Sequence, residues 1–414
     1  MHAYEKSGSE VRVRPVPAPS RRSLRGLDGF NFFIANIQTG FGPFIAVYLT
    51  AQAWTQVDIG LVLTISGIVA LVFQVPGGIL IDAAKHKRTL GAIAAAAIAA
   101  SALMLAAWPI FPLVLGAEML HGLASCLMGP AIAAISLGLV APREIGERLG
   151  RNARYASAGN GIAAVLMGAC GRLVSDRAVF VLTAILAIPA LIALFRIRSQ
   201  EIDPERARGG RPGAGEKRTP LHGIANNRPL LVFGAGLTLF SLANTPMLPL
   251  IGGIVTMHSS QWATVLIAAC IVVPQIFVAL LSPWIGRQSE IWGRRSLLIL
   301  GFAALPIRGI LFAVLASPYL LVAVQILDGI SAAVLGVMLP LVVADVTRGT
   351  GRYNAALGAV GTAAAIGAAL STTLAGYVND RMGSTVAFLS LAGVALLGVG
   401  LLLLFMPETR PTER

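Results

Sequence analysis

The chain has 414 residues, of which 56% are hydrophobic and only 12% are charged. Charged side chains make up about 25% of an ordinary soluble domain, so this composition excludes that class. The net charge of +13 does not indicate nucleic-acid binding, because the basic residues gather in the loops on one side of the predicted helices. Apolar runs of about 18 or more residues recur from end to end, which predicts a multi-pass membrane protein.

The first half of the chain contains six predicted membrane helices. Residues 1–26 are polar, basic and rich in proline, and we expect a disordered cytoplasmic tail without a cleaved signal peptide. The N-terminal bundle follows at residues 27–195. Its helices are predicted near residues 27–50, 59–81, 89–108, 113–140, 155–174 and 178–195.

The second half repeats this organisation after a polar interruption. Residues 196–228 are rich in Arg, Glu, Gly and Pro, which predicts a flexible cytoplasmic linker. The C-terminal bundle is expected at residues 229–406, and a cytoplasmic tail follows at 407–414. The helices of this bundle are predicted near residues 229–257, 262–285, 296–317, 319–344, 355–378 and 384–406.

The distribution of Lys and Arg sets the predicted orientation in the membrane. These residues gather in the two tails, at 85–88, at 143–154, in 196–228 and at 287–295. Because cytoplasmic loops carry an excess of Lys and Arg, both termini are predicted to be cytoplasmic. We expect a protein of the cell (inner or plasma) membrane that contacts the lipid bilayer, acts as a monomer and binds no nucleic acid.

An internal repeat supports the division into halves. Residues 77–90 join two apolar runs through one carboxylate, Asp82, and a short basic turn, and residues 282–295 repeat this arrangement around Glu290. Ala35-Asn36 likewise matches Ala243-Asn244. The repeat predicts an all-α membrane protein with 12 transmembrane helices in two pseudo-symmetric six-helix bundles of the same orientation.

In these hairpins the sequence resembles the major facilitator superfamily, whose turn between helices two and three reads Gly-x-Leu-x-Asp-Arg-x-Gly-Arg-Arg/Lys. The residues that fit are Gly78, Leu80, Asp82 and Lys87 in the first copy, and Gly286, Glu290, Gly293, Arg294 and Arg295 in the second. Ala83 and Lys85 depart from the pattern. The resemblance covers nearly the whole chain and implies a secondary transporter.

The same resemblance implies that the hairpins form a charge lock between helices. In such a lock, Asp82 and Glu290 bind basic or helix-end partners in one conformation and release them when the halves rock. The candidates for this role are Gly78, Asp82, Lys87, Arg88, Glu290, Gly293, Arg294 and Arg295. The alternative is a plain helix end flanked by basic residues that lie at the lipid headgroups.

Glu118, His121 and Ser125 follow one another on one face of a predicted helix. A carboxyl group inside the membrane is costly and usually faces a cavity or a partner, so Glu118 and His121 are candidates for proton coupling. Many members of the family carry an arginine at the position of Glu118, so their relay is not implied here. The alternative is that His121 only satisfies Glu118 across one helical turn.

No metal or cofactor is predicted. A di-iron site built on Glu-x-x-His needs further carboxylates and a second copy of the motif, which the sequence lacks. The phosphate-binding pattern Gly-x-x-x-x-Gly-Lys-Ser/Thr is also missing, so ATP is not the expected energy source.

Arg308 and Asp328 lie at similar distances from the predicted turn between their helices. A charge at that depth rarely stands alone, so we expect the two side chains to form an ion pair. The pair is either permanent or opens when a proton or a ligand reaches Asp328, since buried pairs serve both purposes.

Polar residues in the first helix of each half are candidates for solute contact, because the resemblance implies that these helices line a central cavity. They are Asp28, Asn31, Asn36 and Gln38 in the first half, and Ser241 and Asn244 in the second. The alternative is that they form hydrogen bonds between helices.

Together these features predict a transporter rather than an enzyme. We expect secondary transport of a small organic, partly apolar solute by alternating access, coupled to protons, in the direction of export. Proton-symport uptake of a small metabolite is the first alternative. A non-transporting membrane sensor is disfavoured, because residues 196–228 are too few for a signalling domain.

Overall fold

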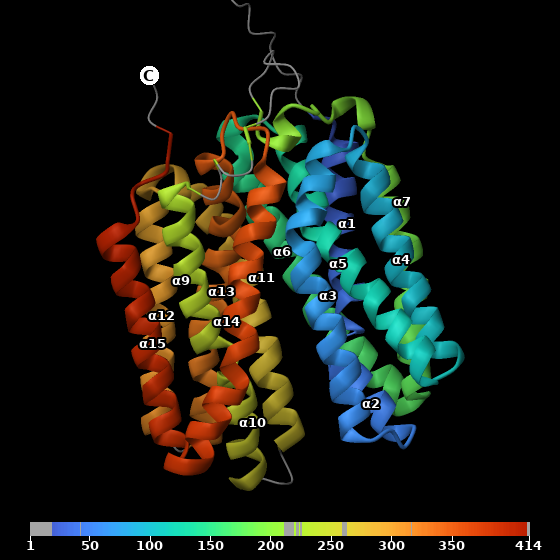
Figure 1. Cartoon of the computed structure of the whole chain (residues 1–414), viewed down its shortest axis with the longest axis vertical. Helices are drawn as coiled ribbons and strands as arrows, with labels where there is room; N and C mark the ends of the chain where they lie inside the picture. Colours follow the sequence, from blue (N-terminus) through green and yellow to red (C-terminus); the bar gives the residue numbers. More distant parts are fainter. Residues whose placement is uncertain are drawn as a thin grey trace, which may run out of the picture.

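A computed structural model describes residues 19–41, 43–210, 219–220, 223, 226–258, 263–315 and 317–411 (Figure 1). Helices account for the secondary structure of these residues. Eleven of the described helical segments are long and apolar enough to cross a membrane. A further helix, α6 (Ile145–Leu173), has a similar length but carries several arginines in its first half. The predicted all-α architecture is confirmed.

The N-terminal bundle comprises the helices up to residue 195. They are α1 (Arg21–Thr39), α2 (Pro43–Ala51), α3 (Gln56–Ala83), α4 (Lys87–Ala107), α5 (Phe111–Leu139), α6 (Ile145–Leu173) and α7 (Asp176–Phe195), with the short 3-10 helix η1 (Pro142–Glu144) before α6. The C-terminal bundle comprises α9 (Arg228–Asn244), α10 (Met247–His258), α11 (Ala263–Trp292), α12 (Arg294–Val314), α13 (Pro318–Val346), α14 (Tyr353–Met382) and α15 (Ser384–Phe405).

The two bundles lean together at one end and diverge toward the other (Figure 1). We call the first the linker end, because residues 196–210 and the turn between α3 and α4 lie there, and the second the far end. Contact between the bundles is made chiefly by α6 against α11 and by α3 against α14. Each of these pairs joins one helix from each half, as expected of a duplicated fold.

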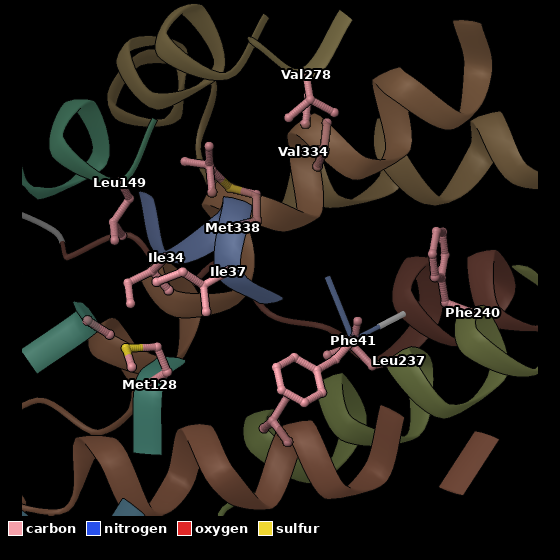
Figure 2. Packing of buried hydrophobic residues seen from close by; sticks show 14 of the residues in the cluster. Ile34, Ile37, Phe41, Met128, Leu149, Leu237, Phe240, Val278, Val334 and Met338 are labelled. Carbon is pink, nitrogen blue, oxygen red and sulfur yellow. The ribbon is translucent and has the colours of Figure 1, made fainter. Parts of the chain in front are cut away.

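One apolar core runs through both bundles. Figure 2 shows side chains of this cluster, including Ile34, Met128 and Leu149 from the N-terminal bundle and Val278, Val334 and Met338 from the C-terminal bundle. Many large apolar residues are instead exposed on the outside of the bundles, for example on α7 and α15. An apolar outer surface is expected where lipid replaces water as the solvent.

The first helix of each half is broken, whereas the sequence predicts one continuous helix at 27–50 and at 229–257. In the first half α1 ends at Thr39 and α2 begins at Pro43. In the second half α9 ends at Asn244 and α10 begins at Met247, directly after Pro246. Proline has no N–H to donate and clashes with the preceding turn, which explains a break at both positions.

Two segments expected to be flexible are ordered in part. Helix α1 begins at Arg21, inside the predicted tail 1–26, because the Ser20 hydroxyl caps it by accepting from the Ser23 N–H. Residues 196–210 of the predicted linker form the 3-10 turns η2 (Ser199–Glu201) and η3 (Arg206–Arg208). Residues 1–18 of the predicted tail, residues 211–218, 221–222 and 224–225 of the predicted linker, and residues 412–414 lie outside the described residues.

Candidate functional site: a cavity between the bundles

A cavity of about 600 Å³ lies between the two bundles and is lined by α1, α3, α5 and α6 on one side and by α11, α13 and α14 on the other. Most of its lining is apolar or glycine. The polar side chains are Asn31, Gln74, Ser125, Asn152, Ser157, Asn160 and Gln275. No Asp, Glu, Lys, Arg or His belongs to the described lining, so the cavity is polar in places but uncharged.

Of the six residues predicted to contact solute, Asn31 lines this cavity. Asn36 instead donates to the Phe32 carbonyl oxygen within its own helix (2.8 Å). Asn244 accepts a hydrogen bond from Arg308. Gln38 and Ser241 are half-buried but do not belong to the lining.

Asp28 is the sixth predicted residue, and it does not belong to the described lining of the cavity. Its carboxylate is buried in an ion pair with Arg148 of α6, and its second oxygen accepts from Arg151 (2.6 Å). The Arg148 side chain is only 3% exposed, so the pair is desolvated on both sides. A carboxylate held by two guanidinium groups is not free to meet a solute.

The amide groups of Asn31 and Asn152 connect this ion pair to the cavity. Arg148 Nε donates to Asn152 Oδ1 (2.9 Å), and Asn31 Nδ2 donates to the same oxygen (3.2 Å). Both asparagines line the cavity. Sequence reasoning missed Arg148 and Asn152, because it placed the start of their helix at residue 155 and treated the preceding arginines as a loop.

Glu118, His121 and Ser125 lie together on α5 as predicted. Glu118 is 4% exposed, and its Oε1 has no hydrogen-bond partner among the described residues. The His121 ring does not bond Glu118. It shares a hydrogen bond with Ser125 Oγ (Nε2 to Oγ, 3.2 Å) and stacks on Phe41 at a ring-centroid distance of 3.8 Å. Since Ser125 lines the cavity, this row of side chains leads from the cavity to a buried carboxyl group.

Arg308 and Asp328 form the predicted ion pair between α12 and α13. Arg308 also donates to Asn244 Oδ1 at the break between α9 and α10 (3.0 Å). The side chain of Arg308 is 2% exposed and that of Asp328 is 27% exposed, so the acidic partner can be reached from outside the core.

The first hairpin contacts the other bundle directly at the linker end. Asp82 Oδ1 accepts from the backbone N–H (3.1 Å) and the side chain (2.8 Å) of Asn354, and Oδ2 accepts from the Ala355 N–H (2.9 Å). A carboxylate at the first turn of α14 is stabilised by the unpaired N–H groups of the helix end and by its dipole. Gly78 lies against the same turn, because a Cβ there would overlap the Asn354 carbonyl.

The second hairpin forms the matching contact between α11 and α6. A Cβ on Gly286 would overlap the Gly146 carbonyl, and a Cβ on Gly150 would overlap that of Ser282. Arg154 Nε adds a hydrogen bond to the Ala279 carbonyl oxygen (2.9 Å). Small residues therefore let the two backbones touch at both copies of the hairpin, and these contacts close the linker end.

The basic residues predicted for the lock bind within their own bundles. Lys87 Nζ donates to the Ile81 and Asp82 carbonyl oxygens at the end of α3. Arg88 donates to the Ile197 carbonyl oxygen and lies over the Phe195 ring. Through these contacts the two residues hold the turn and the start of the linker.

The predicted lock residues of the second hairpin form a cluster within the C-terminal bundle. Arg294 pairs with Glu290 (2.9 Å) and with Asp345 of α13 (2.8 Å), an acidic partner that sequence reasoning missed. Arg295 donates to the Leu403 carbonyl oxygen (2.6 Å). Gly293 has φ +83°, a left-handed conformation that favours glycine at the start of α12.

The linker adds a third component to the closed end. Ala207 is fully buried against Ile81, Ala131 and Ala134 of the N-terminal bundle. Its carbonyl oxygen accepts from Asn354 Nδ2 (3.1 Å), the same amide group that donates to Asp82. Residues 206–209 therefore contact both bundles where α3 meets α14.

Glu408 caps α12 from the C-terminal tail. Its carboxylate accepts from the backbone N–H groups of Arg294 (2.8 Å) and Arg295 (3.1 Å). Partial burial alone would raise the pKa of Glu408. The hydrogen bonds from the Arg294, Arg410 and Arg295 N–H groups outweigh it and hold the pKa below its ordinary value of 4.5.

Because the folded pKa is lowered, the stabilisation by Glu408 is present above about pH 4.5 and is lost as the pH falls through the folded pKa. We expect Glu408→Gln to lower the free energy of unfolding by about 0.5–1 kcal/mol at neutral pH, in the lower range for a helix cap because the side chain is exposed. Thermal unfolding in detergent over a pH series checks this. A difference from wild type that persists unchanged into acid would contradict the capping role.

Comparisons with known proteins agree with this geometry. The Major Facilitator Superfamily family model matches residues 29–277 and 240–414. Two relatives from Mycobacterium tuberculosis, the uncharacterized MFS-type transporters MT2531 (strain CDC 1551) and Rv2456c (strain H37Rv), are each 39% identical over 412 residues. Each match covers 97% of this chain and 96% of the relative.

A solved structure shares the fold. The crystal structure of the human organic anion transporter MFSD10 (TETRAN) aligns with a TM-score of 0.69 at 16% identity, over 92% of this chain and 99% of that one. The chain is thus a multi-pass membrane transporter and not an enzyme. Its family matches, its two bundles and its duplicated hairpin agree that it belongs to the major facilitator superfamily.

Proposed function

We propose that this protein exports a small organic, partly apolar solute in exchange for protons, by exposing the central cavity alternately to the two sides of the membrane. The observation that carries the proposal is the cavity of about 600 Å³ lined by both bundles and closed at the linker end by contacts between them. A mostly apolar lining with a few amide groups suits such a solute.

We further infer that the linker end is cytoplasmic, that both termini lie on that side, and that the protein works as a monomer in the cell membrane. The excess of Lys and Arg at this end supports the orientation. On this reading the described conformation is closed to the cytoplasm. The opposite conformation requires release of the Asp82 carboxylate from the first turn of α14.

The proton pathway proposed for this transporter runs along α5. Ser125 meets the cavity, His121 shares a hydrogen bond with it, and Glu118 lies one turn further with an unpartnered oxygen. No cation pairs with Glu118 among the described residues, so a proton is the group available to neutralise it there. Arg308 and Asp328 are the second candidates, because Asp328 is partly accessible while its partner is buried.

The proposal is tested in everted membrane vesicles that are acidified inside by respiration. Because export then moves solute into the vesicles, a transported solute added outside should dissipate the proton gradient, and a screen of small organic compounds identifies it. Dissipation that requires solute loaded inside the vesicles would indicate symport uptake. A gradient that no solute affects would contradict proton-coupled transport.

Glu118→Gln should abolish the solute-dependent proton flux while downhill exchange of labelled solute continues, because the amide cannot release a proton. Asp380→Asn is the matched control, since this carboxyl group is exposed at the end of α14. Proton flux that is equal in Glu118→Gln and wild type would exclude Glu118 as the carrier.

A further inference from the structure

The cavity contains a pair of side-chain amide groups whose orientation is fixed by residues outside the cavity lining. Asn31 of α1 and Asn152 of α6 both line the cavity, and Asn31 Nδ2 donates to Asn152 Oδ1 (3.2 Å). An amide side chain can ordinarily turn over and exchange its donor for its acceptor. Whether this pair can do so decides what it presents to a solute.

Arg148 prevents the exchange at Asn152. A guanidinium group has only donors, and Arg148 Nε donates to Asn152 Oδ1 (2.9 Å), so the oxygen must face Arg148. Asn152 Nδ2 then donates to Ser136 Oγ (2.7 Å), whose own proton goes to the Ile132 carbonyl oxygen (2.7 Å). Arg148 is itself held by its buried ion pair with Asp28.

The orientation of the Asn31 amide group follows from the orientation of the Asn152 amide group. Asn31 Nδ2 faces two acceptors, Asn152 Oδ1 and the Leu27 carbonyl oxygen (2.8 Å), and both of its protons are used. Among the described residues no donor reaches Asn31 Oδ1. The second proton of Asn152 Nδ2 likewise has no acceptor there. The pair therefore presents one acceptor, on Asn31, and one donor, on Asn152.

We propose that Asn31 Oδ1 and Asn152 Nδ2 form the polar recognition site for an uncharged solute that carries a hydroxyl or an N–H amide group. Such a group donates to Asn31 and accepts from Asn152 at once. A charged group is disfavoured, because the described lining has no ionisable Asp, Glu, Lys, Arg or His and the nearby Arg148 is already paired. This inference rests on the proposed function, since it assigns the cavity to the transported solute.

Two pairs of probes test the site, and in each pair methylation removes the hydrogen-bond donor. The first pair is 7-hydroxycoumarin and 7-methoxycoumarin, compared at mildly acidic pH, where the phenol is neutral. The second pair is benzamide and N,N-dimethylbenzamide. Binding to the full-length protein in nanodiscs is measured from the ligand-dependent rise in its unfolding temperature. We expect the donor-bearing member of each pair to bind about tenfold or more tightly, because the methylated member leaves Asn31 Oδ1 unpaired.

Asn31→Leu should remove this preference in both pairs, and Asn31→Ala serves the same purpose if the leucine variant does not fold. Asn160→Leu is the matched control, because Asn160 lines the same cavity on α6 but does not contact Arg148 or Asn31. The Asn160→Leu substitution should leave unchanged, within each probe pair, the ratio of the affinities of the donor-bearing and the methylated probe.

The outcomes separate this inference from the proposed function. Saturable binding without a donor preference, or a preference that survives in both Asn31 variants, overturns the recognition site and leaves the transporter assignment in place. Failure of every probe to bind wild-type protein overturns the recognition site as stated, while solute-driven proton flux in everted vesicles still decides the proposed function.

Discussion

Gly78→Ala should shift the protein away from the conformation that is closed at the linker end. A Cβ at this position would overlap the Asn354 carbonyl and would lie 2.9 Å from the Ala355 Cα. Both are backbone atoms at the start of α14, so neither can turn aside. Overpacking of this kind costs about 1–3 kcal/mol. Because the cost falls on the closed state alone, the ratio of closed to open protein should fall by about 5–150-fold.

The shift is measured by the distance between spin labels at residues 85 and 348, which are exposed on opposite bundles at the linker end. Cys126, Cys170 and Cys270 are replaced beforehand so that only the introduced cysteines are labelled. Gly67→Ala is the control on the same helix, because nothing lies within 4 Å of a Cβ there. The Gly78 variant should show a longer distance, and a distribution equal to that of the control would contradict the contact.

Asp328→Ala should destabilise the whole protein by about 3 kcal/mol or more, because removing one partner of a buried ion pair leaves the other charge unpaired. Arg308 is 2% exposed, and its Nε already lacks a partner among the described residues. The remaining hydrogen bond to Asn244 cannot neutralise the charge. Thermal and denaturant unfolding of the purified protein measure the loss.

The double variant Arg308→Met/Asp328→Leu should recover most of this stability, since apolar residues of similar volume often replace a buried pair at little cost. Asp380→Ala is the control for loss of an exposed carboxylate and should change stability by about 0.5 kcal/mol or less. If Asp328→Ala is as stable as the control, the pair does not hold α12 against α13. Unchanged transport and pH dependence in Asp328→Asn would separately exclude a switching role.

The fold can be predicted from the sequence because the lipid environment limits which backbone structures can cross the membrane. Every backbone polar group must be satisfied within the membrane, so long apolar runs become helices, and duplication of the hairpin at Asp82 and Glu290 fixes the two halves. The pairing of Arg308 with Asp328 was also predictable, because equal distances from a turn place residues of antiparallel helices at equal depth.

The details that sequence reasoning missed depend on which face of a helix meets which neighbour. Asp28 is assigned to the cavity from its place on the first helix, but the ion pair with Arg148 depends on how α1 lies against α6. Arg148 and Arg151 were the available signal, because two arginines one turn apart on a membrane helix require a carboxylate. Similarly, the linker composition predicts flexibility and gives no sign that Ala207 is buried.

The cavity amides beyond Asn31 illustrate the same difficulty. Gln74, Asn160 and Gln275 are isolated amides in apolar helices, a pattern that fits hydrogen bonds between helices as well as solute contact. In the structure Gln74 lines the cavity, and its Oε1 also accepts a hydrogen bond from Thr362 of the other bundle (3.3 Å). Only the arrangement of the two bundles distinguishes these roles.

The proposed function requires the two bundles to close alternately at opposite ends, and paired distance measurements on one sample test this. Labels at residues 57 and 382, exposed near the far ends of α3 and α14, complement those at residues 85 and 348 at the linker end. We predict that Gly78→Ala lengthens the linker-end distance and shortens the far-end distance in the same sample. Two distances that lengthen together, or a far-end distance that does not respond, would contradict alternating access by these bundles.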